Sequence, residues 1–362
     1  MKTYQLAVIP GDGIGPDVIA ESVETLTYLA TLHGGFQFSM QQFNWGTERY
    51  LREGAMMPTD GLATLERGGF DGILLGPIGD PRVPDHITLR GVVLPLRQAF
   101  DQYVNLRPAR LLPGVHSPLA DKQPQDIDII CVRENTEGEY AGAGGRLYQG
   151  AENEVAIQTT IFTRKGTERI IRYAFEYARR YQRKKVMSAT KSNSLQYNMV
   201  FWDDVFKQVA AEYPDIEHEQ QLIDSLTARF VSRPESLDVV VASNLFGDIL
   251  TDLGAAISGS MGLAPSANLN PERRYPSLFQ AIHGSAPDIV GKNIANPIAS
   301  IWSGQLLLDF LGEQEAATLL MRAIEEVLAS EQAHTPDLGG VATTNQLGQA
   351  IREQIQTIAA RS

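Results

Sequence analysis

The 362 residues are too many for one simple core and predict two domains, and the composition of 43% hydrophobic and 20% charged residues is that of an ordinary globular protein. The formal net charge of -12 argues against nucleic acid as a ligand, because nucleic acid binds mainly to basic surface, so any anionic substrate must be held by locally gathered arginines. The single cysteine, Cys131, excludes an intrachain disulfide, and no stretch approaches the roughly 20 apolar residues that span a bilayer, so the cytoplasm is the expected compartment.

A glycine-rich loop follows the first predicted strand. Residues Tyr4–Ile9 predict that strand, and Pro10–Pro16 lead into an amphipathic helix from Asp17 onward. The glycines alternate as GxGxG and not as the GxGxxG dinucleotide fingerprint, so the loop indicates either a ligand-binding turn or plain turn chemistry. A second short apolar strand, Asp71–Gly76, follows the helix. Strands that alternate with helices predict an open α/β fold with a parallel sheet.

Arginines and a tyrosine lie near the ends of the next predicted elements. Arg97 falls in a helix, Arg107 in the strand after it, and Arg133 at the end of the strand Ile127–Val132. Three arginines at element ends would form the bidentate clamp that a dicarboxylate needs, although an arginine on a surface helix is more often only solvated. Tyr140 follows in a turn-rich segment, where its phenol either acts as an acid or packs.

A lysine follows another predicted strand. The helix Gly166–Arg180 precedes the strand Val186–Ala189, and Lys191 lies just after it. A lysine at a strand's carboxyl end is a candidate general base when acidic metal ligands lie beside it, because desolvated surroundings lower its pKa. The candidate ligands are Asp248 and Asp252, which come later in the chain. Asp224, at the end of a later segment, is a candidate third carboxylate ligand.

Two carboxylates lie four residues apart in one apolar segment, and the other candidate site residues are expected to gather around this segment. Asp248 and Asp252 lie in SNLFGDILTDL, Ser243–Leu253, an apolar run that suits a helix, and residues at i and i+4 share a helical face. The β-branched run Leu237–Ala242 before it predicts a buried parallel strand, whose carboxyl end is where open α/β sheets bind ligands. The pair is therefore either a site for a hard divalent cation or a solvated helix face.

Small residues with backbone donors and one carboxylate, Asp288, follow this helix and suit an adenosine ribose and a diphosphate. They form the segments Gly254–Gly262, Ala264–Asn268, Ala281–Ile289 and Asn293–Pro297. The residues from Ile298 to Ala329 predict a pair of amphipathic helices that serve as scaffold.

Six motifs occur in order along nearly the whole chain. They are GDGIGP, NLRP, VRENTEGEY, ATKSN, SNLFGDILTDL and HGSAPDI. This set resembles the β-decarboxylating dehydrogenases of 2-hydroxy acids, the family of isocitrate and isopropylmalate dehydrogenases. Further segments are most similar to the tartrate dehydrogenases and the decarboxylating D-malate dehydrogenases. These are Val83–His86, Phe100–Tyr103, Ile161–Arg164 and Ala264–Glu272.

The resemblance implies a metal site shared between two subunits. Asp248 and Asp252 would bind Mg²⁺ or Mn²⁺ from one subunit, while Asp224 and Lys191 would come from its partner in a homodimer. It also implies K⁺ as an optional further ion. Neither nucleic acid nor a membrane is an expected partner.

The resemblance also assigns the substrate and its chemistry. Arg97, Arg107 and Arg133 would hold the carboxylate at the carbon that loses carbon dioxide. Lys191 would take the proton of the C2 hydroxyl, directly or through water, while hydride leaves C2 for the nicotinamide. Tyr140 would then protonate C3. With D-malate as substrate the product would be pyruvate.

The cofactor implied is NAD. Asp288 would bind the adenosine ribose hydroxyls, Asn296 would lie near the adenine, and Asn193 near the nicotinamide ribose. His283 and Gly284 belong to the same cofactor-binding motif. Relatives that prefer NADP carry lysine and tyrosine where this chain has Asp288 and Ile289, and a carboxylate repels a 2′-phosphate.

One position departs from the D-malate and tartrate subgroup. Arg90 stands where that subgroup has tryptophan and isopropylmalate enzymes have glutamate, so it either meets another acidic group or rests in solvent. Gly91–Leu94 lack the serine and asparagine of isocitrate enzymes, which disfavours isocitrate. D-malate and tartrate are the leading substrates, and 3-isopropylmalate or another C3-substituted malate is the alternative.

The fold implied is an isopropylmalate dehydrogenase-like, two-domain α/β protein with discontinuous domains. Residues 1–102 and 259–362 would form the cofactor-side domain and residues 103–258 the second domain, with a dimerisation arm near residues 140–163. A catalytically inactive ligand-binding protein of the same fold is the non-enzymatic alternative. It would lack Tyr140, Lys191 or an aspartate ligand, all of which are present.

Overall fold

The computed structural model describes residues 1–361 and consists of two compact units, both α/β as predicted. Unit 1 holds Met1–Gln102, Pro108–Ile127 and the chain from Ala255 onward, and unit 2 holds Tyr103–Arg107 and Asp128–Gly254. The segment Pro108–Ile127, which the sequence assigned to the second domain, thus groups with the first. Side-chain bonds within unit 1 explain this, since Arg110 Nη2 donates to Glu325 Oε1 at 3.1 Å and Ser117 Oγ to the Ile257 carbonyl at 2.6 Å.

The strands of unit 1 follow the order β2-β1-β3-β12-β11. Their bounds are β1 Lys2–Ile9, β2 Phe36–Gln42, β3 Gly72–Leu75, β11 Pro265–Leu269 and β12 Ser277–Ala281. Neighbours from β2 to β12 are parallel, and β11 runs antiparallel to β12. The sequence predicted β1 and β3, whereas it assigned the small residues of Ala264–Asn268, which overlap β11, to cofactor binding and predicted no strand there.

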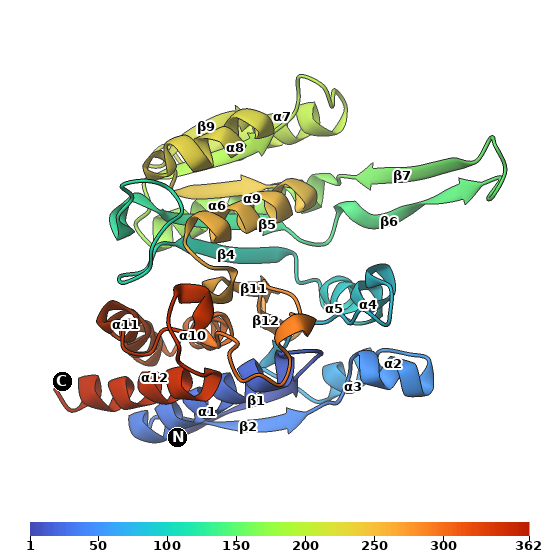
Figure 1. The fold of residues 1–362 in the computed structure, drawn as a ribbon. Helices are drawn as coiled ribbons and strands as arrows, with labels where there is room; N and C mark the ends of the chain where they lie inside the picture. The colour runs from blue at the N-terminus through green and yellow to red at the C-terminus, as the bar shows by residue number, and fades with distance from the viewer. Residues whose placement is uncertain (362) are drawn as a thin grey trace. The chain divides into compact units, whose positions relative to one another are not determined.

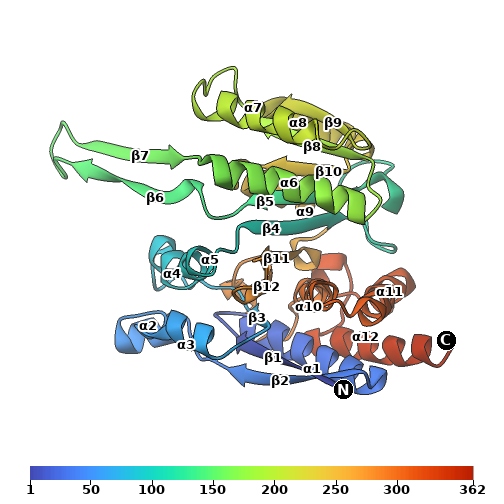
Figure 2. The same cartoon turned by 180° about the vertical axis from the view of Figure 1, so that it is seen from behind.

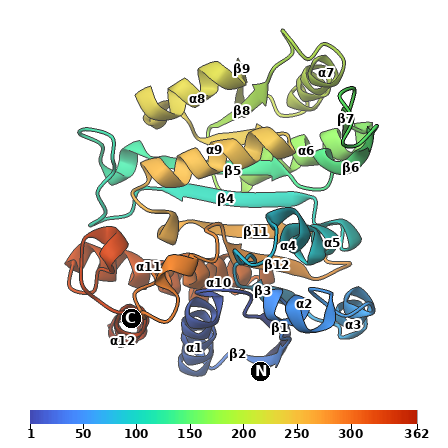
Figure 3. The same cartoon turned by 45° about the vertical axis from the view of Figure 1, so that its right-hand side comes forward.

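Helices cover both faces of these strands. They are α1 Gly15–His33, α2 Thr47–Glu53, α3 Gly61–Arg67, α4 Asp85–Gly91, α5 Val93–Ala99, α10 Ile298–Leu311, α11 Gln314–Ser330 and α12 Thr344–Ala359. Figure 3 shows α1, α10 and α12 gathered together. The expected pair of amphipathic helices is present as α10 and α11, but α10 is buried over most of its length because α1, α11, β11 and β12 pack against it.

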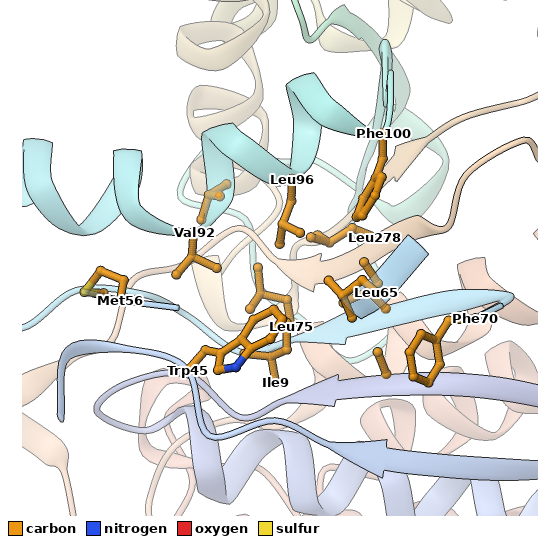
Figure 4. Close-up of a cluster of buried hydrophobic side chains, with 13 residues drawn as sticks. Ile9, Trp45, Met56, Leu65, Phe70, Leu75, Val92, Leu96, Phe100 and Leu278 are labelled. Atoms are coloured by element: carbon orange, nitrogen blue, oxygen red, sulfur yellow. The ribbon is translucent and has the colours of Figure 1, made fainter. Parts of the chain in front are cut away.

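The apolar core on the opposite face joins β1 and β3 to α3 and α5 (Figure 4). Its buried members are Ala7, Ile9, Trp45, Met56, Leu65, Phe70, Ile73, Leu75, Val92, Val93, Leu96, Phe100 and Leu278. Alternate residues of a strand point to opposite faces, which is why Ala7 and Ile9 share this cluster. The cluster fixes the positions of β3 and α5. The loop after residue 75 begins at the end of β3, and Arg97 belongs to α5.

The strands of unit 2 follow the order β4-β5-β10-β8-β9. They are β4 Val104–Arg110, whose last residues belong to unit 1, β5 Asp128–Glu134, β8 Lys185–Thr190, β9 Glu217–Leu222 and β10 Val239–Ala242. The pairs β5-β10, β10-β8 and β8-β9 are parallel. Every residue of β10 is buried, as its unbroken β-branched run predicted for a central parallel strand.

The helices of unit 2 lie on both faces of its strands. They are α6 Arg164–Arg180, α7 Asn198–Ala210, α8 Ile223–Ser232 and α9 Asn244–Ile257, whose last residues belong to unit 1. In Figure 1 α9 lies in front of β5, and in the reverse view of Figure 2 α6 lies in front of it, so the two helices cover opposite faces.

A long antiparallel hairpin extends from the strands of unit 2 (Figure 1). It consists of β6 Gly138–Leu147 and β7 Val155–Ile161, and every residue of β7 is exposed. Tyr140 lies in β6 and not in the turn that the sequence predicted. Within residues 1–361, no helix combines the length and the apolar character that crossing a bilayer requires.

Candidate active site

Two arginines and a tyrosine converge on Asp248, one helical turn into α9. Its carboxylate accepts hydrogen bonds from Arg133 Nη1, from Arg107 Nη1 at 3.3 Å and from the Tyr140 hydroxyl at 3.0 Å. β4 supplies Arg107, β5 supplies Arg133, and the hairpin strand β6 supplies Tyr140. The structure therefore brings together four of the residues that the sequence selected.

Both arginines are buried. Arg107 is 7% exposed and Arg133 is 2% exposed. Burial, followed by repulsion from Arg133, lowers the pKa of Arg107 to about 10, while Asp248 and Asp252 act in the opposite direction. Arg107 Nε is shielded from solvent and has no hydrogen-bond partner among residues 1–361. Two buried guanidinium groups and an unpaired donor suit an anion with several oxygens.

Asp252 lies one turn beyond Asp248 on the same helix, as the spacing predicted. Its Oδ1 is 3.7 Å from Arg107 Nη1. Partial burial of the carboxyl raises the pKa of Asp252, with a further upward contribution from Asp248, although 61% of the side chain is exposed. Two carboxylates on one face offer only oxygen ligands, which suits Mg²⁺ or Mn²⁺.

Lys191 and Asp224 pair with each other. Lys191 follows β8, Asp224 lies in the first turn of α8, and Lys191 Nζ is 2.7 Å from Asp224 Oδ1. This hydrogen bond lowers the pKa of Asp224. Within residues 1–361, no three His, Cys, Asp or Glu side chains gather into a metal site, so Asp224 does not complete the pair on α9 within its own chain. Its predicted action in a partner subunit stays a prediction.

Asn244 and Thr251 belong to the site and were missed by the sequence reasoning. Arg133 Nε and Nη2 both donate to Asn244 Oδ1, at 3.0 and 2.7 Å, and Arg107 Nη1 donates to Thr251 Oγ1 at 2.7 Å. The helical spacing held a signal for them, because residues four before and three after Asp248 share its face.

The other two arginines that the sequence analysis singled out, Arg97 and Arg90, lie in unit 1. Arg97 in α5 is 5% exposed, and Arg90 in α4 is exposed. Exposure favours the solvated alternative for Arg90. Asn193, in unit 2, is an exposed residue of the loop after β8, and its Oδ1 accepts a hydrogen bond from Ser194 Oγ at 3.4 Å.

The glycine loop and the HGSAPDI segment meet within unit 1. The Ile14 backbone N–H donates to the Ser285 carbonyl at 2.9 Å. Gly13 has φ of +60°, and a Cβ there would lie 2.1 Å from the same carbonyl, so only glycine allows this approach. Two segments far apart in sequence thus form one surface of small residues and backbone groups, which fits a nucleotide.

Three other predicted cofactor residues, His283, Gly284 and Asp288, belong to the HGSAPDI segment, and Asn296 lies in the same unit. His283 Nε2 is shielded and lacks a partner among residues 1–361, and burial lowers the pKa of His283, which favours a neutral ring able to bond a ligand. Asn296 Nδ2 donates to Asp337 Oδ2 at 3.0 Å. Gly284 and Asp288 are exposed, so both are accessible to a ligand.

A pocket of about 1170 Å³ lies elsewhere in unit 1, beside α1, β2 and α12. None of the predicted site residues lines it. It touches Asp12 of the glycine loop, whose carboxylate accepts bonds from the Thr47 and Gly79 backbone N–H groups at 2.7 and 2.9 Å. These bonds satisfy the buried carboxylate and connect the glycine loop to the start of α2 and to the loop after β3, which is a structural role.

Comparisons with known proteins identify similar chains. A family model described as isocitrate/isopropylmalate dehydrogenase matches residues 5–351. The chain is 55% identical over 358 residues to D-malate dehydrogenase (decarboxylating) of Escherichia coli strain K12, which covers 97% of this chain and 98% of that protein. It is 51% identical over 361 residues to tartrate dehydrogenase/decarboxylase of Pseudomonas putida, with 98% of each chain covered.

Among solved structures, isocitrate dehydrogenase from Methylococcus capsulatus has a similar fold, with a TM-score of 0.87 and 37% sequence identity. The match covers 98% of this chain and 99% of that one. The predicted fold class is thereby confirmed.

Proposed function

Because the chain belongs to the isocitrate/isopropylmalate dehydrogenase family, we propose that it catalyses the NAD- and metal-dependent oxidative decarboxylation of D-malate or tartrate. The observation that carries the proposal is the convergence of Arg107, Arg133 and Tyr140 on Asp248. This cluster offers cationic donors for a carboxylate, oxygen ligands for a divalent cation and a phenol for proton transfer. The names of two relatives, at 55% and 51% identity, support the choice of substrate.

The buried arginines account for substrate binding. A guanidinium group donates two parallel hydrogen bonds to a carboxylate, and such charge-assisted bonds are stronger in buried surroundings. Arg107 Nε needs an acceptor that the chain itself does not provide within residues 1–361. A substrate carboxylate at this position would satisfy it, and Arg97 is the proposed third donor.

The chain's own groups account for the proton transfers. Bound NAD would supply the acceptor for the hydride on C2. Lys191 would take the proton of the C2 hydroxyl, directly or through water, and a 2-oxo acid with a carboxylate on C3 would result. Carbon dioxide then leaves from C3, and Tyr140 protonates that carbon. The bond from the Tyr140 hydroxyl to Asp248 Oδ2 holds the phenol at the site. A bound divalent cation supplies Lewis-acid stabilisation of the negative charge that develops as carbon dioxide leaves.

The residues present fit both proposed cofactors. Asp248 and Asp252 would hold Mg²⁺ or Mn²⁺, with Asp224 from the partner as a third ligand. The unpaired Nε2 of His283 and the exposed Asp288 fit an adenine nucleotide, and the Asp288 carboxylate favours NAD over NADP by repelling a 2′-phosphate.

A homodimer with shared sites completes the proposal. The hairpin β6–β7 exposes Leu147, Tyr148, Val155, Ile157 and Ile161, and such a set of exposed apolar side chains marks an interaction surface. A second subunit would bury them and bring Lys191 and Asp224 to the other site. The buried free thiol of Cys131 is compatible with the cytoplasm as compartment.

A coupled measurement of NADH formation tests the substrate. The purified chain with Mg²⁺ or Mn²⁺ should oxidise D-malate or a tartrate isomer with kcat/KM at least about tenfold above that for 3-isopropylmalate or isocitrate, a difference of about 1.4 kcal/mol. A preference for 3-isopropylmalate would instead support the alternative substrate and give Arg90 a place in the site. The absence of turnover with all of these acids would refute the proposed function.

A further inference from the structure

We propose that Asn244 and Thr251 are positioning residues that hold the guanidinium groups of Arg133 and Arg107 in the orientation that binds the dicarboxylate. The inference rests on the proposed function and extends it to two residues outside the predicted catalytic and metal-binding set. Both lie on the face of α9 that carries Asp248, one turn before it and one turn after it.

Asn244 is fixed at both ends of its amide. Its Oδ1 accepts from Arg133 Nε at 3.0 Å and from Nη2 at 2.7 Å, while its Nδ2 donates to the Glu137 carbonyl at 2.9 Å. The bond to Glu137 decides which end of the amide is the oxygen. Asn244 and Arg133 are each 2% exposed, so water does not compete for these bonds. One edge of the guanidinium is thereby tied to the backbone that follows β5.

Thr251 holds the second arginine in a similar way. Its hydroxyl donates to the Asp248 carbonyl at 2.9 Å, so the oxygen is left to accept from Arg107 Nη1 at 2.7 Å. Thr251 is 2% exposed. This contact is shorter than the 3.3 Å between Arg107 Nη1 and Asp248 Oδ1, so the neutral hydroxyl is the nearer acceptor for this nitrogen.

Neutral acceptors suit this task better than carboxylates. An amide oxygen and a hydroxyl oxygen fix the direction of a guanidinium without adding a second negative charge beside Asp248, so the two arginines keep more of their positive charge for a substrate carboxylate. Groups held in the binding orientation before the ligand arrives lose less conformational freedom on binding. Asn244 and Thr251 therefore act on substrate affinity through Arg133 and Arg107 and do not touch the reacting atoms.

The matched pair Thr251→Val and Thr251→Ser tests this role. Valine keeps the shape and removes the acceptor, so KM for the preferred dicarboxylate should rise about tenfold, the equivalent of one lost hydrogen bond to a charged group. KM for NAD should stay within about twofold of the parent value, and Thr251→Ser should restore most of the dicarboxylate affinity. Thr357→Val is the control, because it removes a hydroxyl that bonds a helix carbonyl, Glu353 O at 2.9 Å, in α12.

Asn244→Ala tests the second positioning residue independently. It should also raise KM for the preferred dicarboxylate about tenfold. Calorimetric titration with malonate, a dicarboxylate that lacks a hydroxyl to oxidise, in metal-free buffer adds a reading that does not depend on turnover. Parallel losses in malonate affinity and dicarboxylate KM support the inference.

Three results would overturn it in an otherwise active protein. They are an unchanged dicarboxylate KM in Thr251→Val and Asn244→Ala, equal damage in Thr251→Val and Thr251→Ser, and an equal loss of affinity for NAD. If Asn244→Ala fails to fold, the Thr251 pair decides alone. A parent protein without activity on D-malate or tartrate refutes the proposed function itself and is seen before any variant is compared.

Discussion

Asp248 and Asp252 are both proposed metal ligands, yet the structure predicts different effects on stability when each is changed to asparagine. Asp248 bonds Arg133, Arg107 and Tyr140, and 35% of its side chain is exposed. Asp252 is 61% exposed and approaches Arg107 only to 3.7 Å. The comparison is made with EDTA present and without substrate, so that ligand binding adds nothing to stability.

The expected magnitudes follow from burial. Removing one partner of a fully buried ion pair costs about 3–5 kcal/mol. Asp248 is partly exposed and asparagine retains a carbonyl oxygen for the arginines, so we expect Asp248→Asn to lower the free energy of unfolding by about 1–3 kcal/mol. Asp252→Asn should change it by about 0–1 kcal/mol, because exposed pairs contribute little and the repulsion from Asp248 disappears with the charge.

Urea unfolding followed by circular dichroism and by tryptophan fluorescence measures the difference. Trp202 is fully buried in unit 2, and Trp45 and Trp302 are buried in unit 1, so both probes report on both units, and coincident transitions establish two-state unfolding. Mn²⁺ titration of the same proteins should show that both substitutions weaken metal binding. Equal unfolding midpoints for the two variants, or a larger loss for Asp252→Asn, would refute the argument that Asp248 is the principal counter-ion of the arginines.

The remaining predictions concern the cofactors and the two proton-transfer residues. Excess EDTA should abolish turnover and Mg²⁺ or Mn²⁺ should restore it, so full activity in EDTA would contradict the metal site. The Asp288 carboxylate should make kcat/KM at least about tenfold higher with NAD than with NADP, or about 1.4 kcal/mol, and equal use of both would contradict this. Lys191→Met should abolish hydride transfer, whereas Tyr140→Phe should slow the decarboxylation of directly supplied 2-oxo acid more than the oxidation step. Mixing inactive Lys191→Met with inactive Asp248→Asn should restore part of the activity through one intact site per mixed dimer, and tag-purified mixed dimers without activity would refute the shared site.

The sequence alone determined the local elements that carry the site. The strand before Ser243 and the helix after it are present as β10 and α9, and Asp248 and Asp252 share a face because the helical repeat is a local property. A β-branched run predicts a buried strand, and a Gly-Pro loop predicts a helix start, without reference to distant residues. The six ordered motifs also led to the family that the comparisons support.

Only the tertiary structure decided which side chains meet. Arg107 and Asp248 are separated by 141 residues, and their contact depends on how β4, β5 and α9 pack, which no local pattern encodes. The same holds for the bond between Lys191 and Asp224 and for the path of residues 108–127 into unit 1.

The positioning role of Asn244 and Thr251 required atomic distances as well. Nothing in the sequence distinguishes this asparagine and this threonine from others on a helix. Their role becomes visible only in the structure, where two buried arginines lie within 3.0 Å of their side-chain oxygens. Sequence periodicity assigns a residue to a face, whereas a hydrogen bond needs a partner at the right distance and angle, and that partner comes from a distant strand.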